Sequence, residues 1–238
     1  MIKLDNISFH YHKQQSVLNH INLTIDDNEI VGILGESGSG KSTLSSLLLH
    51  ELKPTTGSIR VDTHDILPVF QHASESFNPK LTIQQSLAEP LLYYKKQSTQ
   101  YQHIDQIIQD TTSSFNLPLS LLSKYPYELS GGQLQRFNLL RTLLVKPKVL
   151  ICDEITSNLD VIAEQHMLDI LTENYRKHPY TLIIISHDLS VIQRICHRII
   201  VLKDGAIVDD FNTDQLFSHQ RHPYTKQLVA LSLIHISE

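Results

Sequence analysis

The stretch Val31-Gly-Ile-Leu-Gly-Glu-Ser-Gly-Ser-Gly-Lys-Ser-Thr43 joins a short apolar run to a glycine-rich loop that ends in a Lys-Ser pair. The spacing from Gly35 through Gly40 and Lys41 to Ser42 is that of a phosphate-binding loop. Glycines let backbone N–H groups close around phosphate oxygens, and the positive end of the following helix favours an anion. A strand-like run precedes the loop and a Leu-rich helix follows it. The stretch therefore predicts a nucleoside triphosphate site rather than an ordinary turn.

Nine consecutive residues are expected to contact this nucleotide. Lys41 would lie at the β- and γ-phosphates, and the Ser42 hydroxyl would bind Mg²⁺. The complete set is Gly35, Glu36, Ser37, Gly38, Ser39, Gly40, Lys41, Ser42 and Thr43.

The composition is that of a globular protein. Hydrophobic residues make up 41% and charged residues 19% of 238 residues. The net charge is −5, and because a nucleic-acid footprint is basic and clustered, we expect no nucleic-acid partner. No apolar run reaches about 18 residues, and the first residues do not resemble a signal peptide. Cys152 and Cys196 are expected as buried free thiols in a reducing compartment.

Alternating apolar and polar positions at 2–9 and 21–31 predict antiparallel strands, with a turn at 26–29. This layer leads into the strand before the phosphate-binding loop. Tyr11 is expected in the loop between the antiparallel strands, where packing at a strand end is an alternative to a binding role.

The character of the chain changes between about Leu81 and Glu128, where apolar residues have helical spacing and prolines at 90, 118 and 126 are expected to break the helices. We interpret this segment as a helical subdomain inserted into an α/β frame. The predicted organisation is one domain, with a core at 1–80 and 129–238, a helical subdomain at 81–128 and a short C-terminal extension at 222–238.

Two apolar runs predict buried parallel strands that end in polar residues. The run that begins at Val149 ends at Asp153-Glu154, and the run 181–186 ends at His187. Ligands lie at the C-terminal ends of parallel strands in such sheets, which favours a role in binding or catalysis. A purely structural histidine is the alternative for His187.

Three further signals are weak when each is taken alone. Gln71 follows an apolar run and could be a surface residue, and Asp160 at the start of a predicted helix at 161–176 could be only a helix cap. Leu129-Ser-Gly-Gly-Gln133 opens another predicted helix and could be only a turn.

In this order, however, the motifs resemble those of the ATP-binding subunit of an ABC transporter, over roughly residues 1–228. The phosphate-binding loop comes first, Gln71 is similar to the Q-loop glutamine, and residues 129–133 are similar to the signature motif. Asp153-Glu154 form the second nucleotide motif, Ser157-Asn-Leu-Asp160 resembles the D-loop, and His187 resembles the switch histidine. By the same resemblance, Tyr11 would stack on adenine.

Two stretches resemble the oligopeptide, dipeptide and nickel import ATPases of that family. These are Phe70-Gln-His-Ala-Ser-Glu-Ser-Phe-Asn-Pro79 and His222-Pro-Tyr-Thr225. They favour an importer that carries nickel, a metal chelate or short peptides. The segment between Gly57 and Gln71 is shorter than is usual in these proteins, and Ile155 replaces a proline.

The resemblance implies ATP hydrolysis with ATP and Mg²⁺. Ser42, Gln71 and Asp153 would organise Mg²⁺, Glu154 would be the general base, and His187 would contact the γ-phosphate. Ser130, Gly131, Gly132 and Gln133, together with Asp160, would complete the nucleotide site of a second ATPase subunit in a heterodimer or a homodimer.

A membrane permease would dock near Gln71 and residues 77–92, and it would also receive an extracytoplasmic substrate-binding protein. The chain would then be peripheral, at the cytoplasmic face of the cell membrane. The alternatives are a non-transport ABC ATPase in repair or translation, and a regulatory subunit that binds ATP without turnover.

Overall fold

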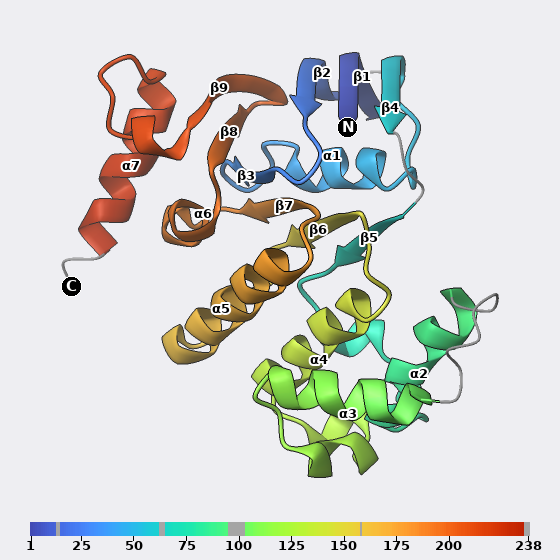
Figure 1. Ribbon diagram of the computed structural model, residues 1–238. Helices are drawn as coiled ribbons and strands as arrows, with labels where there is room; N and C mark the ends of the chain where they lie inside the picture. Colours follow the sequence, from blue (N-terminus) through green and yellow to red (C-terminus); the bar gives the residue numbers. More distant parts are fainter. Residues whose placement is uncertain (13–14, 62–64, 95–102, 158, 236–238) are drawn as a thin grey trace. The chain divides into compact units, whose positions relative to one another are not determined.

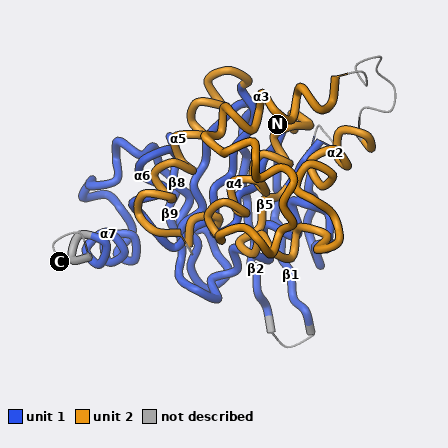
Figure 2. Tube along the Cα trace, turned by 90° about the horizontal axis from the view of Figure 1, so that it is seen from below, with its two compact units in different colours: residues 1–67, 148–154, 179–238 blue, residues 68–147, 155–178 orange. Residues whose placement is uncertain are grey.

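The computed structural model describes residues 1–12, 15–61, 65–94, 103–157 and 159–235. The chain forms two compact units, coloured separately in Figure 2. The first contains residues 1–67, 148–154 and 179–238, and the second contains 68–147 and 155–178. Three predicted segments extend outside the described residues: the D-loop at Asn158, the helical segment at 95–102 and the C-terminal extension at 236–238.

The first unit is built on a mostly parallel sheet with the strand order β5-β6-β7-β3-β8-β9. β3 pairs in parallel with both β7 and β8, and β6 pairs in parallel with β7. The boundary between the two units falls within β5. The strands are β3 (Ile30–Leu34), β5 (Ile66–Val69), β6 (Val149–Asp153), β7 (Thr181–Ser186), β8 (Arg198–Lys203) and β9 (Ala206–Asn212).

The central strands are continuous apolar runs because they are buried on both faces. Every residue of β3 and β7 is buried. A larger residue at Gly32 in β3 would clash with helix α6 (Leu189–Ile195), since a Cβ there would lie 2.4 Å from Cγ2 of Ile192. The absence of a side chain lets α6 pack closely on the sheet.

The predicted antiparallel layer is a separate three-stranded sheet with the order β2-β1-β4. Helix α1 (Lys41–Leu48) lies between this sheet and the parallel sheet (Figure 1), and its leucines join one hydrophobic core with both. The strands are β1 (Ile2–His12), β2 (Gln15–Ile25) and β4 (Thr56–Val61). The predicted loop position of Tyr11 is wrong, because β1 continues through His12 and pairs with β2 there.

The C-terminal part of this unit is a hairpin followed by helix α7 (Pro223–His235). β8 and β9 pair antiparallel around a turn at Asp204-Gly205. A short 3-10 helix, η5 (Thr213–Gln215), follows β9, and α7 contacts α6.

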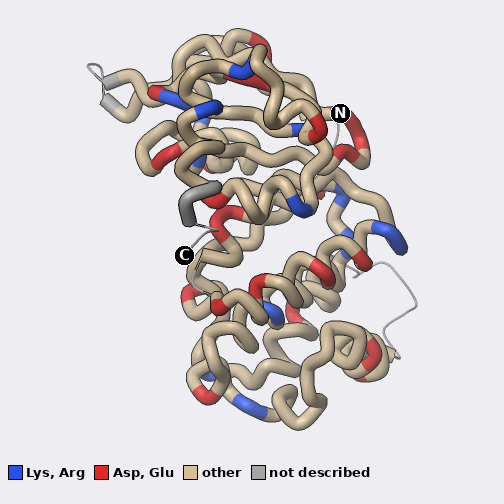
Figure 3. The backbone as a smooth tube through the Cα atoms, turned by 90° about the vertical axis from the view of Figure 1, so that its left-hand side faces the viewer, with Lys and Arg blue, Asp and Glu red and all other residues tan. Residues whose placement is uncertain are grey.

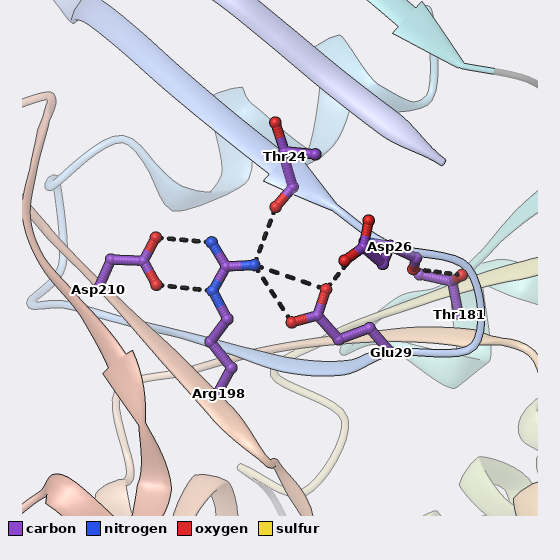
Figure 4. A network of polar contacts seen from close by, with 6 residues as sticks. All are labelled: Thr24, Asp26, Glu29, Thr181, Arg198 and Asp210. Atoms are coloured by element: carbon purple, nitrogen blue, oxygen red, sulfur yellow. Dashed lines mark hydrogen bonds and ion pairs between the residues drawn. The ribbon is translucent and has the colours of Figure 1, made fainter.

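Arg198, the first residue of β8, joins four parts of the first unit (Figure 4). Its guanidinium donates two hydrogen bonds of 2.7 Å to Asp210 on β9, one of 2.9 Å to the Thr24 carbonyl oxygen on β2, and one of 3.2 Å to Glu29 just before β3. Thr181 Oγ1 donates to the carbonyl oxygen of Asp26 beside this group. These contacts attach the antiparallel sheet to the edge of the parallel sheet.

The second unit is helical over its described residues, apart from its share of β5. Helix α2 packs on α3 and α4, and the 3-10 helix η3 packs on α2. The helices are η1 (Ala73–Ser76), α2 (Ile83–Tyr94), α3 (Ile104–Ser114), η3 (Leu119–Ser123), η4 (Pro126–Glu128), α4 (Gly131–Leu143) and α5 (Val161–Lys177).

The prediction that Pro90 breaks a helix is wrong, because Pro90 lies inside α2. A proline is tolerated near a helix start, and its cost in the interior is offset when the helix packs well. Here α2 is anchored by buried Ile83, Leu87 and Leu91. Pro118 and Pro126 do mark boundaries, at the starts of η3 and η4.

Charged residues of both signs are interspersed along the chain (Figure 3).

Cys152 and Cys196 are buried free thiols, as predicted, and burial raises the pKa of both. Among the described residues, no helix is both long enough and apolar enough to cross a membrane.

Candidate functional site

The phosphate-binding loop runs from the end of β3 to the first turn of α1. Gly38 (φ 82°) and Gly40 (φ 105°) have left-handed backbone conformations that favour glycine. Gly35 is required for a different reason: a Cβ there would lie 2.4 Å from the Leu202 carbonyl oxygen and 2.6 Å from Oγ of Ser39. The first N–H groups of α1 have no acceptor within the helix, so the loop presents backbone donors to an anion.

Lys41 is folded back against the loop. Its Nζ atom donates to the carbonyl oxygens of Gly35, at 2.6 Å, and Glu36, at 3.0 Å. The side chain is buried, and this burial lowers the pKa of Lys41, although the nearby carboxylates of Glu154 and Asp153 oppose the shift. The ammonium group therefore lies close to two acids at the end of β6.

Asp153 is the last residue of β6. Burial and the adjacent Glu154 raise the pKa of Asp153, while Lys41 and a hydrogen bond from the Ser42 hydroxyl act in the opposite direction. The Ser42 hydroxyl, from α1, and the Asp153 carboxylate, from β6, thus meet at the carboxyl end of the sheet. Both are oxygen ligands of the kind that Mg²⁺ prefers.

Glu154 and His187 are in direct contact. Nδ1 of His187 lies 2.9 Å from Oε1 and 2.8 Å from Oε2 of Glu154. The backbone of Glu154 has φ 51°, which is uncommon for a residue with a Cβ, and its N–H donates to the carbonyl oxygen of Ile185 on β7. This bond holds the turn after β6 against the neighbouring strand, and it places the carboxylate beside the residue that follows β7.

Tyr11 lies at the end of β1, and its phenol oxygen is 3.3 Å from Oγ1 of Thr43 in α1. Its ring packs edge-on against Phe9, with 4.9 Å between the centroids, yet 58% of the residue is exposed. The side chain is thus anchored at both its edge and its hydroxyl, and it keeps exposed surface beside the phosphate-binding loop.

The remaining predicted site residues belong to the second unit. Gln71 lies in a bend after β5, and its Nε2 atom donates to Oγ of Ser157, at 2.9 Å. Asp160 caps α5, because its carboxylate accepts the N–H of Ala163 at 2.8 Å. Asp160 is therefore the N-terminal cap of α5, as the local pattern predicted.

The signature motif forms the start of α4. Ser130 and Gln133 make a reciprocal capping box, in which each side chain accepts the backbone N–H of the other residue. Gly131 and Gly132 are different. A Cβ on Gly131 would meet nothing within 4 Å, and one on Gly132 would make only ordinary contacts at 3.7 Å. Local structure explains the two polar residues but not the two glycines.

The first unit therefore brings together the loop 35–43, Tyr11, Asp153, Glu154 and His187, while Gln71, the signature motif and Asp160 lie in the other unit. Tyr224 is not among the predicted site residues, yet its hydroxyl oxygen accepts the N–H of Glu36 at 3.1 Å. Its presence in the His222-Pro-Tyr-Thr225 motif was the only available signal.

Comparison with known proteins gives a consistent result. The family model described as ABC transporter matches residues 18–157. The nickel import system ATP-binding protein NikE of Staphylococcus aureus (strain MRSA252) is 56% identical over 229 residues, which cover 96% of this chain and 98% of NikE.

Two solved structures extend the comparison to the fold. The dimeric, post-hydrolysis structure of the ATP-binding cassette MJ0796, bound to ADP and Pi, has a TM-score of 0.78 at 27% identity and covers 90% of this chain and 99% of that one. The cbiO1 protein of Clostridium perfringens, part of the ABC transporter complex cbiONQ, has a TM-score of 0.81 at 25% identity. The match covers 99% of this chain and 96% of cbiO1. The chain belongs to the ABC transporter family, as one of its ATP-binding, ATP-hydrolysing cassettes.

Proposed function

We propose that this chain powers the import of nickel, as a free ion or a chelate, by hydrolysing ATP at the cytoplasmic face of the cell membrane. The observation that carries the choice of cargo is the 56% identity to NikE over nearly the full length of both chains. A cassette does not touch the cargo, so its own site residues carry no information on nickel. Short peptides remain the alternative cargo, and the reported relatives do not favour a repair, translation or purely regulatory role.

The proposed nucleotide site uses the loop residues 35–43 for the phosphates and Tyr11 for the adenine. Lys41 would exchange its two carbonyl acceptors for phosphate oxygens, which is favourable because a buried ammonium gains from a full negative charge. The exposed ring of Tyr11, held in place by Phe9 and Thr43, supports a stacking role.

Mg²⁺ would bind to the hydroxyl of Ser42 and the carboxylate of Asp153. Their hydrogen bond brings the two oxygen ligands together. Burial, and after it the adjacent Glu154, raise the pKa of Asp153, and a bound cation would favour its charged form. Gln71 is proposed as a further ligand, which requires its amide to leave Ser157. The ion would neutralise charge on the β- and γ-phosphates.

Hydrolysis requires a water molecule aligned with the γ-phosphoryl group. We propose Glu154 as the general base or water-orienting group and His187 as a donor to the γ-phosphate. The contact between the two side chains supports a shared task, because the imidazole orients the carboxylate while its other ring nitrogen stays available. Both residues follow strands of one sheet, which fixes their separation.

The signature motif is proposed to act on the nucleotide of a second ATPase subunit, with Asp160 beside that interface. The two glycines support this proposal, since the fold has room for a Cβ at both positions. A requirement for close approach by a partner's nucleotide would explain them. The partner is proposed to be a different cassette in a heterodimer, with a homodimer as the alternative.

The permease is proposed to dock near Gln71 and residues 77–92. Phe70, Leu92 and Tyr93 expose 41%, 48% and 71% of their surfaces there, which supports a role in protein association. An extracytoplasmic substrate-binding protein would deliver the cargo to that permease. We retain the proposal of a single functional domain, 1–238, in which the helical segment 81–128 directly precedes the signature motif at 129–133.

The test combines uptake and hydrolysis. Cells that lack the chain would be complemented with the wild type or with Glu154→Gln, and uptake of radioactive nickel and of a labelled dipeptide would be measured. Nickel uptake restored by the wild type alone is the expected result. Restored dipeptide uptake without nickel uptake would change the cargo, and equal restoration by Glu154→Gln would contradict the role of ATP hydrolysis.

A further inference from the structure

The start of α7 contacts the phosphate-binding loop. The phenol oxygen of Tyr224 accepts the backbone N–H of Glu36 at 3.1 Å, and only 4% of Tyr224 is exposed. Nζ of Lys203, at the end of β8, lies 4.7 Å from the centre of the Tyr224 ring. A segment near the C-terminal end of the described chain thus reaches the second residue of the loop.

Asp209 on β9 holds this segment in place. Its Oδ2 atom accepts the N–H of His222 at 2.8 Å and the hydroxyl of Thr225 at 2.9 Å, while Oδ1 pairs with Arg221 at 3.2 Å. The Arg221 guanidinium also lies 4.2 Å from the centre of the Phe211 ring. Thr225 and Tyr224 are both buried, so the turn has little freedom to shift.

The peptide unit between Gly35 and Glu36 is held from both ends. Its N–H donates to Tyr224, and its carbonyl oxygen, on Gly35, accepts from Nζ of Lys41. When Lys41 turns toward phosphate oxygens, the contact at the carbonyl end is lost. The bond to Tyr224 is made by the N–H at the other end of the same peptide unit, so it does not depend on the position of Lys41.

We propose that Tyr224 is a positioning residue for the phosphate-binding loop, and that Asp209 acts through it. The phenol fixes the orientation of the Gly35–Glu36 peptide, which reduces the conformational freedom that the loop must lose when a nucleotide binds. This inference rests on the proposed nucleotide site, and it gives the His222-Pro-Tyr-Thr225 motif a role in that site.

The first test is Tyr224→Phe, which removes one oxygen and keeps the ring. ADP with Mg²⁺ would be titrated into the purified full chain by calorimetry, and thermal unfolding would be recorded without nucleotide. One neutral hydrogen bond corresponds to about a 3- to 10-fold change in binding constant, so we expect ADP to bind more weakly by that factor.

Tyr180→Phe is the matched control, because Tyr180 belongs to the same unit, is also 4% exposed and precedes β7 at the opposite end of the strand from the site. We expect its ADP affinity to equal that of the wild type. Equal weakening in both variants, or unchanged affinity in Tyr224→Phe while the wild type binds ADP, would overturn the inference. Failure of the wild type to bind ADP would instead overturn the proposed nucleotide site and the inference with it.

Asp209→Asn supplies a second, independent measurement. An amide has one acceptor oxygen in place of two, so the variant loses either the Arg221 pair or the bonds to His222 and Thr225. We expect Asp209→Asn to bind ADP more weakly than the wild type. The double variant, Asp209→Asn with Tyr224→Phe, should have the same ADP affinity as the single variant that binds ADP less tightly. Additive losses would show that Asp209 acts on general stability and not through Tyr224.

Discussion

His187 Nδ1 lies within 2.9 Å of both carboxylate oxygens of Glu154, and the two residues come from turns after neighbouring strands. The side chain of Glu154 is 17% exposed and that of His187 is 63% exposed. The carboxylate is therefore mostly buried, while most of the imidazole is exposed to solvent. This pairing predicts different consequences for substitutions of the two residues.

Glu154→Gln should keep nucleotide binding and lower the ATPase rate by a factor of roughly 10² to 10⁴, the usual contribution of one general base. The amide retains the shape of the side chain and a hydrogen-bonding oxygen for His187. Single-turnover hydrolysis, measured with the partner subunits present, together with ADP titration, would check this. Turnover within a factor of a few of the wild type would remove Glu154 from the proposed role.

His187→Ala should lower turnover on the order of 10²-fold, because a donor to the transferring phosphoryl group is lost. Binding of ADP, which has no γ-phosphate, should stay unchanged. His219→Ala is the control, since His219 is an exposed histidine of the same unit. If His187→Ala weakened ADP binding as much as it slowed hydrolysis, the residue would be structural rather than catalytic.

Asp153→Asn should abolish Mg²⁺-dependent nucleotide binding and yet stabilise the free chain at neutral pH. Burial and Glu154 raise the folded-state pKa of Asp153 above 3.8, so the folded chain holds this proton more tightly than the unfolded chain. The associated stability is present at low pH and is lost as the pH rises through the raised pKa.

The stability advantage of Asp153→Asn over the wild type should therefore grow between about pH 4 and pH 7. Urea unfolding without nucleotide or Mg²⁺, at several pH values, measures this directly. The quantity to follow is the urea midpoint of the variant minus that of the wild type. If this difference were smaller at pH 7 than at pH 4, the ammonium of Lys41 would stabilise the carboxylate more than burial destabilises it.

Arg198→Lys should lower the free energy of unfolding by about 1–3 kcal/mol, because an ammonium cannot make the paired bonds to Asp210 and also reach the Thr24 carbonyl oxygen. The control is Lys3→Met, which removes an exposed pair with Asp5 and should change stability by less than about 0.5 kcal/mol. Chemical denaturation of both variants would compare them. Equal effects would show that the Arg198 network contributes no more than a surface ion pair.

The buried strands and the loop between β3 and α1 were predictable because each is determined by local residue pattern. Apolar runs at 149–153 and 181–186 have one stable placement in a doubly wound sheet, and that placement puts Asp153 and His187 at the same edge. The end of β1 was mispredicted although Phe9, His10, Tyr11 and His12 continue the alternation of aromatic and polar residues. Pairing with β2, a tertiary effect, extends the strand.

Contacts between residues distant in sequence were not predictable from pattern. Tyr224 and Glu36 are 188 positions apart, and the bond joins a phenol oxygen to a backbone N–H. Since every residue except proline has such an N–H, the sequence carries no sign of this pairing. Pro90 was mispredicted because proline strongly disfavours a helix interior, whereas packing of α2 keeps this proline inside a helix. The roles of the site residues follow from the family resemblance and not from local pattern.

Gly132→Ala separates the requirements of the fold from those of the assembled site. A Cβ at this position would make ordinary 3.7 Å contacts with Ala163 and Leu159, and alanine has the higher helix propensity by about 1 kcal/mol. The isolated variant should therefore be at least as stable as the wild type and should bind ADP equally well. Turnover with the partner ATPase should fall, because the added methyl group would obstruct the partner's nucleotide.

Gly35→Ala is the contrasting variant, since its Cβ would lie 2.4 Å from the Leu202 carbonyl oxygen and 2.6 Å from Ser39 Oγ. Backbone atoms cannot yield as a flexible side chain can, so this substitution should destabilise the isolated chain and weaken its ADP binding. Thermal unfolding and ADP titration of each chain alone, followed by ATPase assays with the partner, give the full comparison. Normal turnover of Gly132→Ala in the assembled complex would contradict the proposal that the signature glycines approach a second subunit's nucleotide, whatever the result for Gly35→Ala.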